Sequence, residues 1–236
     1  MITPFGSPQN LYLYQYFHIS IGEFAWVMFI PFTVSVTLIL ALCLLVPKTP
    51  LGEIEFQSKF VFWPTILHFA LFFIAVAIVF RALPVLAGFI IPMVLLVVDR
   101  RALRKVDYGL LLTFVLFFIF AGNIGRIESI DNALTALLEK NVLIWSALAS
   151  QVISNVPSAI RFAPFTDNWR ELLVGVNIGG VGTIIASLAS LIALRQFDIF
   201  QPGRTKYFIW IFTLVNLGLL VVLIAVSELA FRLGIL

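Results

Sequence analysis

The strongest constraint on this chain is a long apolar run that carries no charge. Phe24–Val46 contains no Asp, Glu, Lys or Arg. A helix of that length can cross the hydrocarbon core of a bilayer, about 30 Å, with some tilt. Hydrophobic residues make up 61% of the chain and charged residues 11%, a composition that no soluble domain has. The sequence therefore predicts an all-α integral membrane protein in contact with the lipid bilayer.

Further spans are expected at about residues 60–80, 82–98, 108–122 and 207–227, with short polar loops between them. Threading the spans alternately puts residues 47–59, 99–107 and 195–206 on one side with nine Lys and Arg, against six on the other side. The positive-inside rule places the side with nine in the cytoplasm. We expect a multi-pass protein of the plasma membrane. Its net charge of +3 gives no reason to expect a nucleic-acid partner.

One apolar segment, residues 172–194, is interrupted in a way that an ordinary membrane helix is not. It contains four glycines within eight successive residues, and each glycine costs a helix roughly 1 kcal/mol relative to alanine. Asn177 and Thr183 flank the cluster, and together these features predict a helix that opens at membrane depth. The alternative is a close helix crossing, because Gly175 and Gly179 have the spacing of the small-residue packing motif.

A second irregular region lies at residues 141–166. Asn141–Ile153 and Val156–Phe165 are largely apolar pieces, each too short to cross the membrane alone. Ser154 and Asn155 lie between them. Two short helices that meet at a polar tip predict a re-entrant hairpin, which is tolerated at depth only inside protein or beside a cavity. Alternatively, Asn155 caps the second helix of the pair.

The chain also contains a weak internal repeat. Residues 1–46 align with residues 181–226 without a gap and share nine identities, among them Thr3 with Thr183. The polar break and the span after it coincide in both copies. The threading above makes the two copies cross in opposite directions, which is typical of an inverted-repeat secondary transporter whose site lies between paired broken helices.

The repeat divides the chain unequally. Residues 1–46 supply the end of a first repeat, namely a broken helix and one span, whereas residues 47–236 supply a second repeat with its hairpin, broken helix and spans. The counterpart of the tip at Ser154 would lie before Met1. We therefore expect the N-terminal repeat to be largely missing, and the partner of this chain to be that N-terminal half or a second copy in a homodimer.

The polar segments of these breaks resemble the signature motifs of a known superfamily. Thr3-Pro4-Phe5-Gly6-Ser7-Pro8-Gln9-Asn10 is similar to the segment that ends the first half of arsenite- and citrate-type permeases. Ser154-Asn155-Val156-Pro157 resembles their hairpin tip, and Asn177–Ser190 resembles their second Gly-Thr break. These permeases belong to the ion transporter superfamily, together with the divalent anion/sodium symporters. In the symporters the third residue of the tip is Thr, where this chain has Val156.

The resemblance implies a secondary active permease for a small inorganic or organic anion, coupled to Na+ or H+ and needing no other cofactor. Half-helix N-termini offer free N–H groups and a positive dipole end to an anion, and unwound carbonyls with side-chain oxygens suit a small cation. The residues expected at the site are polar or small, and they are Ser154, Asn155, Asn177, Gly179, Gly180, Gly182 and Thr183, with Thr3, Ser7 and Asn10 as first-half counterparts. A sodium ion would be held by Ser154, Asn155 and Thr183. Asn177 has the alternative role of bonding one helix to another.

Two ionisable residues, His68 and Arg161, lie within apolar segments of the chain. His68 lies in the middle of the span at 60–80, where it is the group available for a proton relay or else bonds a neighbouring helix. Arg161, in the second hairpin arm, is expected to extend to the membrane interface. The chain has no Gly-x-Ser-x-Gly motif and no Asp within its predicted spans, so we do not expect an enzyme. The alternative to a transporter is a non-transporting membrane scaffold or one subunit of a split transporter.

Overall fold

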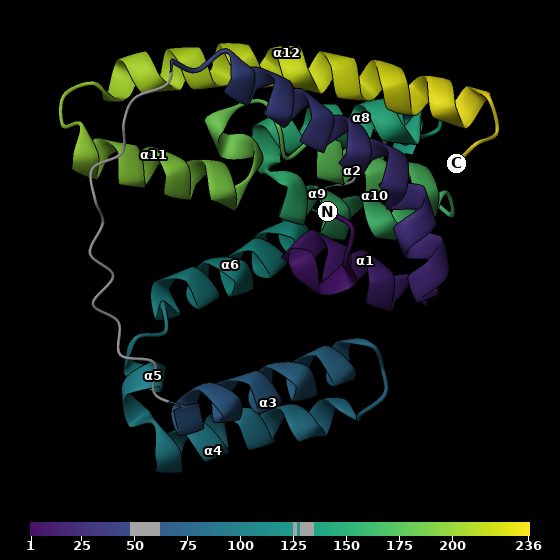
Figure 1. Ribbon diagram of the computed structural model, residues 1–236. Helices are drawn as coiled ribbons and strands as arrows, with labels where there is room; N and C mark the ends of the chain where they lie inside the picture. The colour runs from purple at the N-terminus through teal and green to yellow at the C-terminus, as the bar shows by residue number, and fades with distance from the viewer. Residues whose placement is uncertain (48–61, 125–126, 128–134) are drawn as a thin grey trace. The chain divides into compact units, whose positions relative to one another are not determined.

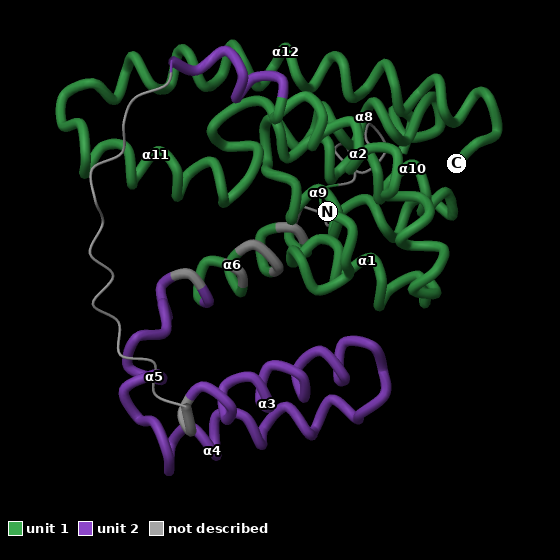
Figure 2. Tube along the Cα trace, in the orientation of Figure 1, with its two compact units in different colours: residues 1–40, 112–236 green, residues 41–111 purple. Residues whose placement is uncertain are grey.

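The computed structural model describes residues 1–47, 62–124, 127 and 135–236. All regular structure in these ranges is helical (Figure 1), which confirms the all-α prediction. The chain divides into two compact units, residues 1–40 with 112–236 and residues 41–111 (Figure 2). The predicted loop at 47–59 lies outside the described residues except for Pro47.

The unit of residues 41–111 is built from short helical segments, namely α3 (Phe62–Val79), η2 (Val85–Phe89), α4 (Ile90–Val98) and α5 (Arg100–Arg104). The predicted span at 82–98 begins later than expected, because Arg81 lies in a turn with φ 60°. The predicted loop at 99–107 contains α5, because the Asp99 side chain accepts a backbone N–H of the first turn and caps the helix. The following helix, α6 (Tyr108–Ile124), covers the span predicted at 108–122.

The hairpin region consists of α8 (Val142–Ile153) and α9 (Asn155–Phe162), followed by a short turn, η3 (Ala163–Phe165). These helices have 12 and 8 residues, so neither reaches across a bilayer by itself. The first helix begins where it does because Asn141 Oδ1 accepts the N–H of Ile144 at 2.7 Å. The chain reverses at Ser154, where φ is 72°, and the two helices pack against each other.

The glycine-rich segment is divided into α10 (Trp169–Ile178), η4 (Ile184–Ala186) and α11 (Leu188–Phe200). Residues between these elements have no regular helical structure, as the prediction of an opened helix requires. Helix α11 extends past the predicted boundary at 194, because charged residues such as Arg195 do not interrupt a helix. The predicted loop at 195–206 is therefore reduced to four residues, 201–204, which contain Pro202 and Gly203.

The N-terminal segment contains η1 (Pro4–Gly6), α1 (Pro8–Tyr16) and α2 (Ile21–Leu44). Helix α2 begins at Ile21, three residues before the predicted Phe24, because Ser20 and Glu23 form a capping box. The N–H of Glu23 donates to Ser20 Oγ, and the N–H of Ser20 donates to Glu23 Oε2, both at 3.3 Å. The glutamate thus lies in the first turn of the helix, where a negative charge is stabilising.

The two segments of the internal repeat have the same local backbone. Both 3-10 turns, and both helices after them, begin at equivalent positions of the aligned ranges 1–46 and 181–226. Ser7 and Ser187 precede the two helices in similar extended conformations, with ψ of 154° and 153°. From these positions α1 and α11 lead away in opposite directions, and α2 runs antiparallel to α12 (Thr205–Arg232) (Figure 1).

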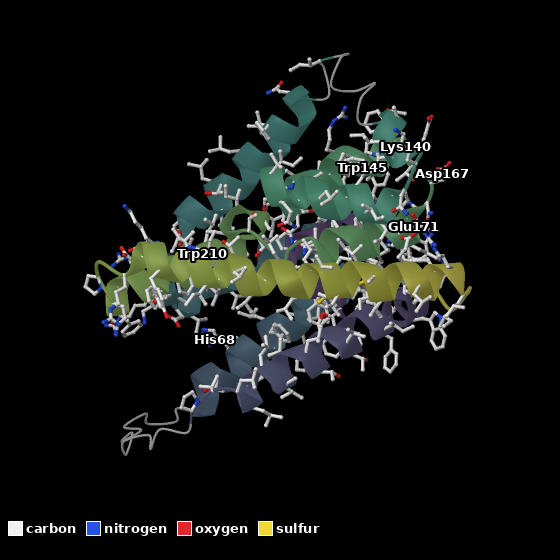
Figure 3. All side chains as sticks on the ribbon, turned by 90° about the horizontal axis from the view of Figure 1, so that it is seen from above. His68, Lys140, Trp145, Asp167, Glu171 and Trp210 are labelled. Carbon is white, nitrogen blue, oxygen red and sulfur yellow. The ribbon has the colours of Figure 1, made fainter. Side chains whose placement is uncertain are left out.

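Two of the described helices, α2 and α12, are long and apolar enough to cross a membrane. The last helix is fixed to the base of the hairpin, because Asn141 Nδ2 donates to both carboxylate oxygens of Glu228 at 3.1 Å. Lys140, Asp167 and Glu171 lie toward the same end of α12, and Trp210 lies toward its other end (Figure 3). Charged groups therefore gather at the base of the hairpin.

The core of the larger unit draws on both copies of the repeat. Buried side chains from α1, α2, α8, α9, α10 and α12 form one cluster, which includes Leu13, Phe24, Leu143, Phe162, Leu172 and Leu223. In this cluster the hairpin packs against α1 and α10, and η4 packs against α8 and α12. The hairpin tip and the broken helix are consequently held by protein on several sides.

Candidate functional site

The hairpin tip places a strained serine inside the larger unit. Ser154 has φ 72° and ψ 154°, a conformation that costs a residue other than glycine about 1–3 kcal/mol. Its carbonyl accepts a hydrogen bond from Ser158 Oγ at 2.8 Å. Its own Oγ donates to the carbonyl of Ala186, at the end of η4, at 3.3 Å. The strained residue is thus bonded both to the second hairpin helix and to the broken helix.

Asn155, the first residue of α9, is only 6% exposed. Within the described ranges, no residue forms a hydrogen bond with its side-chain amide. Its Nδ2 lies 2.7 Å from the point where a Cβ on Gly180 would be, so the amide sits against the glycine backbone. The alternative that Asn155 caps α9 is wrong, because Ser154 is the N-cap residue and no side chain caps this helix. An amide that forms no hydrogen bond with its neighbours has donors and an acceptor available to a ligand.

A pair of asparagines joins the N-terminal segment to the broken helix. Asn177 Nδ2 donates to Asn10 Oδ1 at 2.6 Å and to the carbonyl of Leu173 at 2.8 Å. Asn10 is completely buried, and its Nδ2 donates to the carbonyls of Met1 and Thr3 at 3.1 and 3.3 Å. The structure therefore brings these two predicted site residues together, and the alternative role of Asn177 as a bond between helices is also realised.

The glycines of the broken helix serve two different purposes. A Cβ on Gly175 would lie 2.0 Å from Ser146 Oγ, and one on Gly179 would lie 2.8 Å from the Cα of Ala147. These two glycines let α10 approach α8 closely, so the helix-crossing alternative is correct for them. The helix nevertheless ends at Ile178. Close packing and an opened helix therefore occur in one segment, and they do not exclude each other.

A residue that the sequence did not single out, Gln151 of α8, bonds the hairpin to the break. Its Nε2 donates to the carbonyls of Gly179 and Val181 at 2.7 and 3.1 Å, and its Oε1 accepts the N–H of Thr183 at 2.9 Å. Gly182 lies so close that a Cβ there would be 2.1 Å from Oε1, and its φ of 131° also favours glycine. The sequence offered only one signal for this role, a polar residue three positions before the tip.

Thr183 and the first-half residues Thr3 and Ser7 differ in their hydrogen bonding. Thr183 Oγ1 donates to the backbone carbonyl of Gln151 at 3.0 Å, and Thr3 takes part through its carbonyl, which accepts from Asn10. Ser7 Oγ is buried and has no hydrogen-bond partner in the described part of the chain. Of these hydroxyls, the one on Ser7 is the group left unbonded beside a break.

Three helices, α1, α9 and α11, begin at the tip or directly after a break. Their first turns present N–H groups and the positive end of a helix dipole, both of which attract anions. Ser7 Oγ beside the first break is buried and unbonded within the described ranges, and the Asn155 amide at the tip forms no hydrogen bond with a described residue. In the described ranges no group of three or more His, Cys, Asp or Glu is arranged to hold a metal ion. Chemically, the arrangement is suited to binding a small anion through N–H, amide and hydroxyl donors.

The two ionisable residues discussed from the sequence lie elsewhere. Arg161 is only 6% exposed, and its guanidinium carbon lies 4.3 Å from the centre of the Phe165 ring. The expectation that it extends to the interface is therefore wrong, because the cation stacks on an aromatic face inside the protein. His68 belongs to the unit of residues 41–111, where its Nε2 lies 3.4 Å from Asp99 Oδ2.

Comparison with known proteins identifies relatives of this sequence. Residues 1–170 match the family described as citrate transporter. The chain is 34% identical over 230 residues to the uncharacterized transporter MJ0456 of Methanocaldococcus jannaschii, covering 96% of this chain and 62% of that protein. It is 29% identical over 209 residues to the inner membrane protein YbiR of Escherichia coli, covering 83% of this chain and 54% of the relative.

The chain thus spans between about half and about three fifths of the length of these relatives. No solved structure matches it significantly. The family match covers well over half of the sequence and includes the N-terminal break, the hairpin tip and the beginning of α10. On these grounds the chain belongs to the citrate transporter family.

Proposed function

We propose that this chain is part of a secondary active transporter for a small anion, and that the anion binds where the hairpin tip meets the two breaks. The observation that carries the proposal is Asn155, a residue only 6% exposed, whose carboxamide lies beside Gly180 and forms no hydrogen bond with a described residue. Membership of the citrate transporter family supports the class of protein. Citrate is accordingly the first substrate to test, and arsenite is the second because of the motifs at Thr3–Asn10 and Ser154–Pro157.

An inverted repeat is part of this proposal. The matching backbone at equivalent positions of residues 1–46 and 181–226 supports a common origin of the two segments. The opposite directions of α1 and α11, and of α2 and α12, support their inversion (Figure 1). In transporters of that type the substrate site lies near the bilayer midplane between the paired broken helices. The Asn10–Asn177 hydrogen bond, which joins the two breaks, supports a site between them.

For the coupling ion we propose Na+ or H+. A sodium ion would use the oxygens of Ser154, Asn155 and Thr183. The two hydroxyls donate to the carbonyls of Ala186 and Gln151, so their lone pairs remain free to face a cation. Uptake driven by a sodium gradient, compared with uptake driven by a pH gradient, distinguishes the two ions.

The proposed location is the plasma membrane, with several crossings. The name of the YbiR relative, an inner membrane protein, supports this location, and so does the length of α2 and α12. Because the chain spans only part of each relative, we propose that transport requires either the additional segment that the relatives possess or a second copy of this chain. The family description and the name of the MJ0456 relative, a transporter, support a permease.

The test replaces Asn155 by alanine and uses Asn216→Ala as the matched control. Asn216 lies in α12, and among the described residues its amide donates only to the carbonyl of Phe212 in the same helix, at 2.7 Å. Both variants are reconstituted into liposomes, with and without the additional segment of the relatives, and assayed for uptake of labelled citrate and arsenite. Asn155→Ala should reduce uptake by roughly a hundredfold or more, since one donor group is lost from a small dehydrated site. Asn216→Ala should retain it.

Thermal unfolding of the same preparations separates binding from folding. The midpoint of Asn155→Ala should stay close to that of the wild type, because no hydrogen bond to the described residues is broken. Near-normal uptake by Asn155→Ala would move the anion site away from the hairpin tip. If neither citrate nor arsenite is taken up by any folded preparation, the alternative of a non-transporting scaffold is favoured.

A further inference from the structure

The break between α10 and η4 leaves backbone groups that the helix no longer bonds. At the end of α10 the N–H groups of Gly180 and Val181 still reach carbonyls three residues back, at 3.2 and 3.0 Å. Beyond them the carbonyls of Gly179 and Val181 and the N–H of Thr183 have no backbone partner among the bonds around the break. Inside a membrane each such group would destabilise the fold if it stayed unbonded.

One side chain supplies all of these missing partners. Gln151 Nε2 donates to the carbonyls of Gly179, Val181 and Ala147 at 2.7, 3.1 and 3.1 Å. Its Oε1 accepts the N–H of Thr183 at 2.9 Å. The amide can have only this orientation, because the reverse would set an oxygen against three carbonyls and an NH2 group against an N–H.

The contact also fastens the break to the hairpin. Gln151 lies in α8, three residues before the tip, and its own carbonyl accepts from Thr183 Oγ1 at 3.0 Å. The Oε1 of Gln151 occupies the space that any side chain at Gly182 would need. Its Nε2 donates to the carbonyls of Gly179 and Val181, which in an unwound helix could otherwise coordinate a cation. The broken helix is thereby held open by a permanent group of the protein.

We propose that Gln151 is a positioning residue for the anion site, whose carboxamide holds the broken helix open and keeps it attached to the hairpin tip. Gln151 touches neither the anion nor the ion in this proposal. It fixes the backbone of residues 179–183, and through Gly180 it fixes the surface against which Asn155 lies. The inference rests on the proposed function for its effect on transport, and on the hydrogen bonds alone for its effect on the break.

The test replaces Gln151 by glutamate, which has nearly the same shape. When protonated, glutamate keeps one donor and one acceptor, whereas ionised glutamate has acceptors only. Burial beside three carbonyls favours the protonated form. The stabilising contribution of the glutamate in Gln151→Glu should therefore be present at low pH and lost as the pH rises. Gln151→Met, which has neither donor nor acceptor, should be impaired at every pH.

The matched control is Gln196→Glu, the same change at an exposed position of α11. Thermal unfolding and citrate uptake are measured for all proteins between about pH 5 and about pH 8, a range over which a raised glutamate pKa would be crossed. At the lower pH Gln151→Glu should come closest to the wild type, although its single donor replaces only part of the bonds that the Gln151 amide donates. At the higher pH its KM for citrate should rise by about tenfold or more relative to Gln196→Glu, with a smaller change in kcat per folded protein.

Two outcomes would overturn the inference. If Gln151→Glu follows Gln196→Glu in stability and KM at every pH, the amide does not hold the break. If its stability depends on pH while KM does not, Gln151 is a structural bond without a positioning role. If the wild type takes up neither substrate, the proposed function fails, and the role of Gln151 in the break then needs a test that does not use transport. A labelling experiment provides that test.

That test measures the labelling rate of a cysteine at Val181, a partly buried position within the break, after Cys43→Ser removes the cysteine of the wild type. Raising the pH accelerates labelling in both proteins because the thiolate fraction grows, but the acceleration should be larger in Gln151→Glu than in Gln196→Glu, because the break loses its support only in the former. Equal rates in the two proteins would refute the role of Gln151 without any reference to transport.

Discussion

Replacing Gly180 by alanine should impair the proposed anion site and leave the fold nearly intact. A Cβ at this position would lie 2.7 Å from Asn155 Nδ2 and 3.3 Å from the carbonyl oxygen of Asn177. The closer contact is with the far end of a side chain that can rotate, so the protein relieves it by moving the amide. Because that amide is the proposed ligand of the anion, KM for citrate should rise by about tenfold or more. The free energy of unfolding should change by about 1 kcal/mol or less.

The neighbouring glycine provides the contrast. A Cβ on Gly179 would lie 2.8 Å from the Cα and 2.9 Å from the carbonyl oxygen of Ala147, and these backbone atoms cannot move without separating α8 from α10. Overpacking of this kind costs about 1–3 kcal/mol, so Gly179→Ala should unfold at lower temperature. Gly218→Ala in α12 is the control, because no described atom outside its own turn of helix lies within 4 Å of a Cβ there. It should be neutral or stabilising by up to about 1 kcal/mol.

Citrate uptake by proteoliposomes and thermal unfolding in detergent measure the two effects on the same three proteins. If Gly180→Ala unfolds as readily as Gly179→Ala, the Asn155 amide is rigidly packed and not free for a ligand. An unchanged KM in a well-folded Gly180→Ala protein would show that displacing this amide does not disturb the anion. Either result would refute the reasoning.

Two further predictions concern the joined breaks and the topology. A double-mutant cycle on Asn10→Ala and Asn177→Ala should give a coupling free energy of about 1–2 kcal/mol by reversible unfolding, whereas effects that add within about 0.5 kcal/mol would mean that the 2.6 Å hydrogen bond contributes nothing. Cysteines placed at Ser20 and Leu103 in a Cys43→Ser background should react with membrane-impermeant reagents from opposite sides, and reaction from one side would contradict the proposed inversion.

The irregular parts of this fold were the most predictable from sequence. Ser154 and Asn155 between two short apolar runs, and glycines inside a third, cannot be accommodated in straight membrane helices, so the tip and the break could be located before their geometry was known. The internal repeat likewise predicted equivalent backbone around Ser7 and Ser187, which the structure shows. These inferences depend on backbone hydrogen bonding, which composition and local pattern govern closely.

The partners of individual side chains could not be predicted in the same way. Gln151 reaches residues 28 to 32 positions away, and Asn141 reaches Glu228 across 87 positions, and no local pattern encodes such distances. Helix ends were also misplaced where charge was taken as a boundary. Glu23 lies inside α2 because it completes a capping box, and α11 continues past Arg195 because only Pro202 and Gly203 stop it.

Equivalent positions in the two copies have acquired unequal chemistry. Ser187 accepts the N–H of Ser190 at 3.2 Å and shares a hydrogen bond with the hydroxyl of that residue at 2.9 Å, so it is fully occupied by its own helix. Asn10 stands at the place of Ser190 in the first copy, and Ser7 is left with a buried hydroxyl that no described residue bonds. Such a group lowers the stability of the folded chain. A bound anion whose oxygen accepted a hydrogen bond from the Ser7 hydroxyl would recover that lost stability. Binding would therefore stabilise the fold at the first copy of the break and not at the second.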